Sequence, residues 1–163
     1  MIQTFKAVQD ASRELLALTE KQINEILLAV ADATLANADY ILSENEKDLA
    51  RMDKANPKYD RLKLTHKRLE DIAADTRNVA SLPSPLDRLL VQSTLPNGLR
   101  LRKVSVPFGV IGIIYEARPN VTTDAAAVAI KSGNACVLRG GKEAFRSANA
   151  VVNALRKGLK KLG

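Results

Sequence analysis

Apolar side chains recur at helical spacing through the first eighty residues of the chain. Thr19 followed three residues later by Gln22 is typical of a capping box, and Thr65 is predicted to cap a later helix. After these caps the apolar residues are spaced by three and four positions, as on one face of an amphipathic helix. These residues are Ile23, Ile26, Leu27, Val30 and Ala31, then Leu69, Ile72, Ala73 and Val79. An intervening helix that carries Ile41 and Leu49 is predicted to end at Asn56-Pro57. We therefore predict a helical region over residues 1–82, with core-facing stripes and no catalytic grouping.

Two extended stretches follow, at residues 89–95 and 99–106. They are separated by Pro96, Asn97 and Gly98, and Asn-Gly is typical of a tight hairpin whose two central residues have positive φ. An isolated two-stranded hairpin is marginal in water, so it must pack on its own chain or pair with another subunit. We predict that residues 83–106 form a hairpin arm and that residues 89–106 support a homo-oligomer.

From residue 107 the pattern changes to that of a parallel α/β fold. Val110 to Ile114 is nearly continuous in apolar residues, as in a strand buried on both faces, and residues 135–138 predict a second such strand. Helices are predicted over residues 121–132, closing at Gly133, and over residues 143–162. Two βα units are too few for a doubly wound sheet, so residues 107–163 are predicted to be the first, incomplete part of one.

Composition narrows the class of protein. No apolar stretch approaches the ~20 residues of a membrane helix, the amphipathic start is unlike a signal peptide, and one cysteine excludes an internal disulfide. These features predict a cytoplasmic chain. Residues 101–163 carry 11 Lys and Arg against 3 Asp and Glu, a net +8 that could attract nucleic acid or a small phosphorylated ligand. Few aromatic side chains are available for base stacking, which disfavours the nucleic-acid alternative.

Residues of chemical interest follow the two predicted parallel strands, where α/β sheets bind ligands. Gly140 and Gly141, flanked by Arg139 and Lys142, lie between a strand and a helix. Glycines and a helix N-terminus there suit a phosphate or nucleotide, although a plain βα turn has the same pattern.

Asn120 begins the first helix, and its side chain is suited either to cap that helix or to donate its amide to an oxyanion. Arg118 could clamp a carboxylate or phosphate, or be a surface charge. Cys136 lies inside a predicted buried strand and is interpreted as an inert thiol. His66 has no second histidine beside it, so no metal site is predicted.

These motifs together resemble the gamma-glutamyl phosphate reductase family, also called glutamate-5-semialdehyde dehydrogenases, a branch of the aldehyde dehydrogenase superfamily. The resemblance is carried by Pro96-Asn97-Gly98-Leu99-Arg100, by residues 106–122 with Tyr-Glu-Ala-Arg-Pro-Asn-Val-Thr at 115–122, and by residues 131–135 and 138–141. It implies an aldehyde dehydrogenase-like α/β fold: N-terminal helices, a hairpin arm and the first half of a Rossmann-like sheet.

The resemblance also implies a reaction. Family members reduce L-glutamyl 5-phosphate with NADPH to L-glutamate 5-semialdehyde and phosphate, in proline biosynthesis, through a cysteine thioacyl intermediate. It implies that Asn120 is the oxyanion donor, with Arg118 as a substrate contact. Residues 139–143, which are Arg139, Gly140, Gly141, Lys142 and Glu143, would bind NADP(H), with Lys142 and Glu143 competing for the ribose position.

The chain departs from the family in length. It resembles only the N-terminal part of these enzymes, whose catalytic cysteine lies in a later domain that has no counterpart here, and Cys136 does not match that position. The resemblance therefore implies that the isolated chain is inactive. The alternative is a non-catalytic, truncated relative that acts as an oligomerising interaction module.

Overall fold

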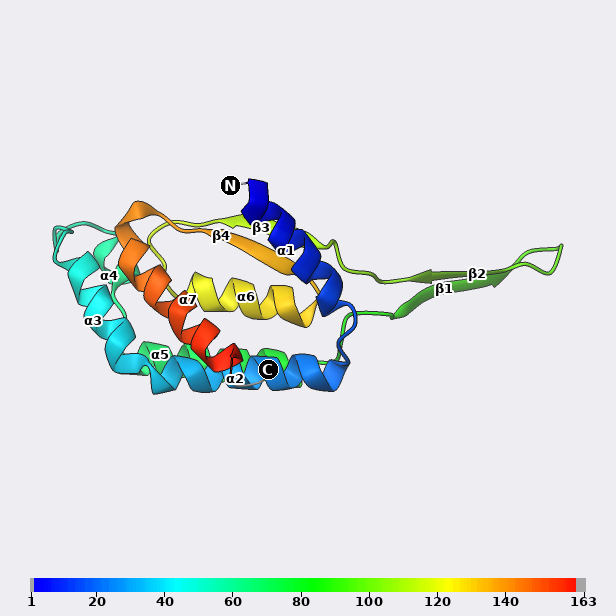
Figure 1. Cartoon of the computed structure of the whole chain (residues 1–163), viewed down its shortest axis with the longest axis horizontal. Helices are drawn as coiled ribbons and strands as arrows, with labels where there is room; N and C mark the ends of the chain where they lie inside the picture. The colour runs from blue at the N-terminus through cyan, green and yellow to red at the C-terminus, as the bar shows by residue number, and fades with distance from the viewer. Residues whose placement is uncertain (1, 161–163) are drawn as a thin grey trace.

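The computed structural model describes residues 2–160 as helices arranged around a small parallel sheet, with a long two-stranded arm (Figure 1). The elements in chain order are α1 (Ile2–Leu15), α2 (Glu20–Ala36), α3 (Ala38–Leu49), α4 (Tyr59–Leu62), α5 (His66–Ser81), β1 (Leu89–Thr94), β2 (Arg100–Val104), β3 (Val110–Ile114), α6 (Val121–Lys131), β4 (Ala135–Arg139), the 3-10 turn η1 (Lys142–Ala144) and α7 (Phe145–Leu159). The predicted α/β class is confirmed. The predicted end of the last helix, at Leu162, lies outside the described residues.

The predicted starts of α2 and α5 are confirmed by their capping geometry. At the start of α2, the backbone N–H of Gln22 donates to Thr19 Oγ1, and the backbone N–H of Thr19 donates to Gln22 Oε1 at 2.9 Å. Thr65 likewise accepts from the backbone N–H of Arg68 and caps α5. The predicted boundary at Asn56-Pro57 is wrong, because α3 already ends at Leu49 and turns follow it.

The core lies between the N-terminal helices and the later helices α6 and α7. One cluster of buried side chains joins Val30, Ile41 and Leu69 to Val151 and Leu155 on α7, and a second joins Leu27 to Ala127 on α6. In Figure 1, α6 lies between the β3–β4 sheet and the pair α2 and α5. The N-terminal helices therefore share core clusters with α6 and α7, and the division of the chain into regions 1–82 and 107–163 stays a prediction.

Strands β3 and β4 pair in parallel through the crossover helix α6, as predicted, with Val110 opposite Ala135 and Ile114 opposite Arg139. Gly133 ends the crossover helix with φ +69°, which suits glycine. The expectation that β3 is buried on both faces is wrong. Its residues alternate between exposed and half-buried, and Ile114 is 86% exposed. The physical reason is that no further layer among the described residues covers these alternate positions.

Strands β1 and β2 pair antiparallel and project from the rest of the molecule as an arm (Figure 1). Every residue of both strands is exposed. The predicted turn type is wrong: Gly98 has φ +84°, but Asn97 does not have positive φ. Instead the Asn97 side chain accepts from the Leu99 backbone N–H, and the Gly98 N–H donates to the Leu95 carbonyl. This geometry is that of a three-residue loop, in which only the glycine needs a left-handed backbone.

Within residues 2–160 no single helix is long and apolar enough to cross a membrane. Helices α2 and α3 meet the length and composition requirement only when joined, and they are bent by 65°.

Candidate functional site

The loop between β3 and α6 carries the first candidate residues. Ala117 has a left-handed backbone with φ +47°, a strained conformation for a residue with a Cβ, and it is buried. Pro119 is fully buried, whereas Arg118 between them is exposed. The Lys58 ammonium donates to the Glu116 carboxylate at 2.6 Å, and this hydrogen bond lowers the pKa of Glu116. A buried turn thus fixes the backbone and directs Arg118 outward.

Asn120 does not cap α6 with its side chain. Its backbone is already helical, and α6 begins with backbone bonds to the Arg118 and Pro119 carbonyls. The capping interpretation of Asn120 is therefore wrong. The side-chain amide instead donates from Nδ2 to Oδ2 of Asp124, one helical turn later, at 2.9 Å. Burial is the main cause that raises the pKa of Asp124, Asn120 opposes this, and the nearby Asp75 carboxylate adds to it.

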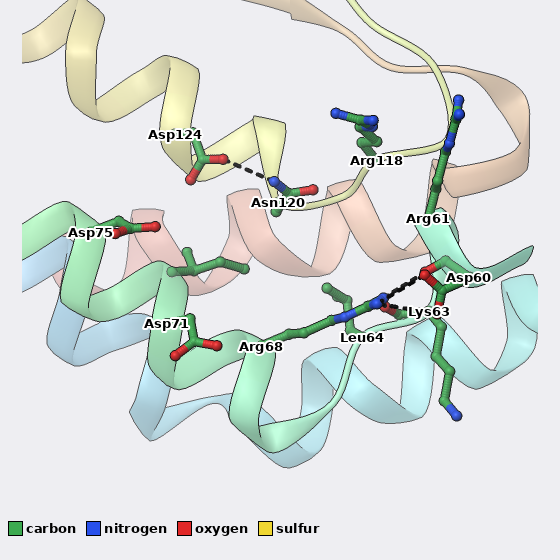
Figure 2. Close-up of a pocket in the computed structure, with 11 residues that line it drawn as sticks. Asp60, Arg61, Lys63, Leu64, Arg68, Asp71, Asp75, Arg118, Asn120 and Asp124 are labelled. Atoms are coloured by element: carbon green, nitrogen blue, oxygen red, sulfur yellow. Dashed lines mark hydrogen bonds and ion pairs between the residues drawn. The ribbon is translucent and has the colours of Figure 1, made fainter. Parts of the chain in front are cut away.

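Asn120 and Arg118 line one cavity of about 340 Å³, between the start of α6 and helices α4 and α5 (Figure 2). Its wall is strongly charged and is formed by Asp60, Arg61, Lys63, Leu64, Arg68, Asp71, Ile72, Asp75, Arg118, Asn120 and Asp124. Figure 2 shows Asp71, Asp75 and Asp124 toward one end and Arg61 and Arg118 toward the other. Such a wall suits a small polar ligand that carries both signs of charge.

The wall contributed by α5 was missed by the sequence analysis. Arg68, Asp71 and Asp75 are spaced by three and four residues, so they share one helix face beside the apolar stripe. Arg68 also donates both to the Asp60 carboxylate, at 3.1 Å, and to backbone carbonyls before α5, which anchors α4 to α5. The spacing was a usable signal, but a charged helix face is far more often merely solvated than functional.

The glycine loop after β4 lines a different cavity, of about 300 Å³. Arg139, Gly140, Gly141 and Lys142 form part of its wall, with Tyr115, Leu138, Phe145, Ala148, Asn149 and Val152. A Cβ added to Gly140 would lie 3.3 Å from the Tyr115 ring, a tight contact that the ring would have to relieve by shifting. Glu143 is not part of this wall, and its carboxylate lies against Gly141. The predicted free helix start is replaced by the 3-10 turn η1 ahead of α7.

The sole cysteine lines neither cavity. Cys136 is half-buried in β4, and burial raises its pKa, which keeps the thiol protonated and unreactive. His66 lies on the surface with Nε2 3.6 Å from Asp39 Oδ1. Within residues 2–160 there is no group of at least three His, Cys, Asp or Glu side chains that could hold a metal ion.

The sequence and the fold were compared with those of known proteins. No protein-family model matches the chain. It is 65% identical over 158 residues to the gamma-glutamyl phosphate reductase of Bacteroides thetaiotaomicron, covering 97% of this chain and 38% of that protein. It therefore spans little more than a third of the curated relatives that it matches.

Solved structures agree in fold. Gamma-glutamyl phosphate reductase from Thermotoga maritima superposes with a TM-score of 0.93 at 33% identity, covering 98% of this chain and 39% of that one. A probable aldehyde dehydrogenase from Listeria monocytogenes superposes at 0.70 with 17% identity, over 97% of this chain and 33% of its own, and this likeness shows the fold alone. In sequence and in fold, the chain belongs to the gamma-glutamyl phosphate reductase family.

Proposed function

We propose that the chain forms part of a cytoplasmic reductase that converts L-glutamyl 5-phosphate to L-glutamate 5-semialdehyde and phosphate with NADPH, in proline biosynthesis. The observation that carries this proposal is the charged cavity in which Asn120 and Arg118 meet. It occurs in a chain that is 65% identical to a gamma-glutamyl phosphate reductase.

The charges of this cavity are complementary to the proposed substrate. Glutamyl phosphate carries a carboxylate, a phosphate and an ammonium group. Arg118 and Arg61 suit the anionic groups, because a guanidinium binds a carboxylate or a phosphate through two hydrogen bonds. Asp71 and Asp75, toward the other end, suit the ammonium group. Asn120 lies between the two ends, where its amide can donate to the oxygen that becomes negative during acyl transfer.

The glycine loop fits the adenosine half of a nicotinamide dinucleotide. Its cavity combines apolar side chains with Arg139 and Lys142, and its two glycines let the backbone approach a phosphate. Lys142 lines this cavity and Glu143 does not, which favours Lys142 for the additional phosphate of NADP. When bound, NADPH supplies the hydride. Arg139, Gly140, Gly141 and Lys142 would hold its adenosine end.

The nucleophile must come from elsewhere, because the thiol of Cys136 is half-buried, lines neither cavity and has a raised pKa. We therefore expect the 163-residue chain to be inactive by itself. The arm is the second part of the proposal: its exposed apolar strands would pair with another copy of the chain. The same exposure supports the alternative of an oligomerising module without catalysis.

The test joins this chain to the Bacteroides thetaiotaomicron reductase in place of its 158 matching residues. Activity is followed in reverse, as NADPH formed from glutamate 5-semialdehyde, phosphate and NADP. We expect the fusion to be active, and Asn120→Ala to lower kcat by roughly 10²–10³-fold, as for loss of an oxyanion donor. Asn153→Ala, an exposed asparagine on α7, is the control and should leave kcat unchanged. A folded but inactive fusion, or an Asn120→Ala variant of normal kcat, contradicts the proposal and favours the module.

A further inference from the structure

The hydrogen bond between Asn120 and Asp124 has a direction that matters for chemistry. Nδ2 of Asn120 donates to Oδ2 of Asp124 at 2.9 Å, across one turn of α6. The Asn120 side chain makes no capping bond to its own helix. Among the described residues, Asp124 is therefore the group to which the Asn120 amide is bonded.

An ionised carboxylate can only accept hydrogen bonds, whereas a primary amide has a donating NH₂ end and an accepting oxygen end. The two ends of the amide are nearly the same size, so packing alone does not choose between them. An ionised Asp124 selects one orientation of the Asn120 amide, because it attracts the NH₂ end and repels the oxygen. One N–H is then used by Asp124, and the second remains for a ligand in the cavity.

We propose that Asp124 is a positioning residue that holds the Asn120 amide with its NH₂ end available as the oxyanion donor. This inference rests on the proposed function. If the amide rotated by half a turn, its carbonyl oxygen would face the developing negative charge, and the interaction would become repulsive. The carboxylate is thus required for the direction of the amide, and it need not touch the substrate.

The charged groups around Asp124 bear on its ionisation. The charged side chains of the cavity wall are Arg68, Asp71 and Asp75 on α5, Asp60 and Arg61 on α4, Lys63 after α4 and Arg118 before α6. Burial is the main cause that raises the pKa of Asp124, the hydrogen bond from Asn120 lowers it, and the Asp75 carboxylate raises it further. Protonated Asp124 would carry an O–H that can donate to the amide oxygen of Asn120. At acid pH the amide should therefore adopt either of its two orientations.

A purely structural explanation also exists, because an acid in the first turn stabilises a helix through the positive end of its dipole. The two explanations differ in what they predict. A structural role predicts lower stability on substitution, with normal kinetics at a temperature where the protein is folded. A positioning role predicts a lower kcat with little change in KM, and a changed environment of the Asn120 NH₂ group.

The first experiment is NMR of the 163-residue chain, following the side-chain NH₂ signals of Asn120. We expect two well-separated proton signals, one of them protected from exchange, that shift together with the titration of Asp124. In Asp124→Ala the two signals should approach each other and lose protection. Asp124→Asn, whose oxygen can still accept, should restore part of the separation. Glu25→Ala removes the acid of a comparable i,i+4 pair on α2 and should change nothing. Identical Asn120 signals in wild type and Asp124→Ala would overturn the proposal.

The second experiment measures kinetics in the fusion with the Bacteroides thetaiotaomicron reductase. We expect Asp124→Ala to lower kcat by roughly five- to tenfold, the effect of having to order one free side chain in the transition state, with KM within about twofold. Asp124→Asn should recover part of kcat, and Glu25→Ala should match wild type. An inactive wild-type fusion overturns the proposed function itself. An active fusion in which Asp124→Ala has normal kcat, or raises KM alone, overturns only the role of Asp124. If the fusion does not fold, the NMR result decides.

Discussion

Two regions of the molecule differ in the burial of their apolar side chains. One is the helical body, residues 2–82 and 107–160, and the other is the arm, residues 89–104. In the body, Leu27 and Leu69 are completely buried between helices. In the arm, Leu90 and Val91 are 55% and 56% exposed, and both strands are exposed throughout. The body is thus stabilised by its own apolar burial, whereas the arm presents apolar surface that gains nothing until something covers it.

The largest expected effect on stability lies in the body core. Leu27→Ala removes a side chain with no exposure and should lower the free energy of unfolding by about 3 kcal/mol, through lost burial and a residual cavity. The measurement is urea denaturation followed by circular dichroism. Leu28→Ala is the matched control, since Leu28 is the next residue of α2 and is 43% exposed. Equal losses in the two variants would contradict the described core.

A smaller effect is expected at a buried ammonium group. Lys131 is 5% exposed, and its Nζ donates to Asn24 Oδ1 at 2.6 Å and to the Ala80 carbonyl at 3.0 Å, linking α6 to α2 and α5. Lys131→Met leaves both acceptors without this donor and should lower the free energy of unfolding by roughly 2 kcal/mol. Lys67→Met, which breaks an exposed ion pair with Asp71, should change it by at most about 0.5 kcal/mol. An unchanged free energy of unfolding in Lys131→Met would show that these hydrogen bonds do not stabilise the helical body.

A still smaller effect in the body depends on pH. The pKa of Asp124 is raised in the folded protein, so between its unfolded and folded pKa values the folded state binds more protons. Stability from this group is therefore greatest at acid pH and falls as pH rises through that window. Asp124→Asn removes this dependence, so the variant should gain stability relative to wild type between acid and neutral pH. Denaturation at several pH values measures it, and a constant difference between the two proteins would count against the raised pKa.

The smallest effect on stability is expected in the arm. Leu90→Lys combined with Val91→Lys should change the free energy of unfolding of the body by less than about 0.5 kcal/mol, because both side chains are already exposed. The same variant should lower the oligomeric state measured by light scattering, because charges replace the apolar contact surface. A wild-type protein that is already monomeric would remove the proposed role of the arm.

Much of the fold could be predicted because its signals are local. The capping box at Thr19, the cap at Thr65 and the closing glycine at Gly133 each depend on residues within a few positions of one another, and all three are confirmed. The burial of β3 could not be predicted, because it depends on which layers cover the strand rather than on its own sequence. The turn at Asn97 was misassigned for a related reason: the side-chain bond to Leu99 competes with the left-handed backbone that Asn-Gly permits.

The candidate site was predicted in part. Asn120, Arg118 and the glycine loop were named from their motifs, and the structure groups the first two in one cavity while the glycine loop lines another. Asp71 and Asp75 were not named, because nothing in a solvated helix face indicates which distant segment packs beside it. The partnership of Asn120 with Asp124 was also missed, although both residues lie within one helical turn.

The helices, the parallel βα units, the arm and the family are all predictable from sequence, since periodicity, caps and motifs are properties of neighbouring residues. Three features emerge only in the folded chain: α5 and the start of α6 line one charged cavity, the Asn120 amide bonds to Asp124 rather than capping its helix, and one face of β3 stays uncovered. Cavity lining and strand burial depend on segments brought together from distant parts of the chain, which a local sequence pattern does not reveal. The bond between Asn120 and Asp124 is local, but the sequence pattern does not say whether the amide caps its helix or bonds one turn later.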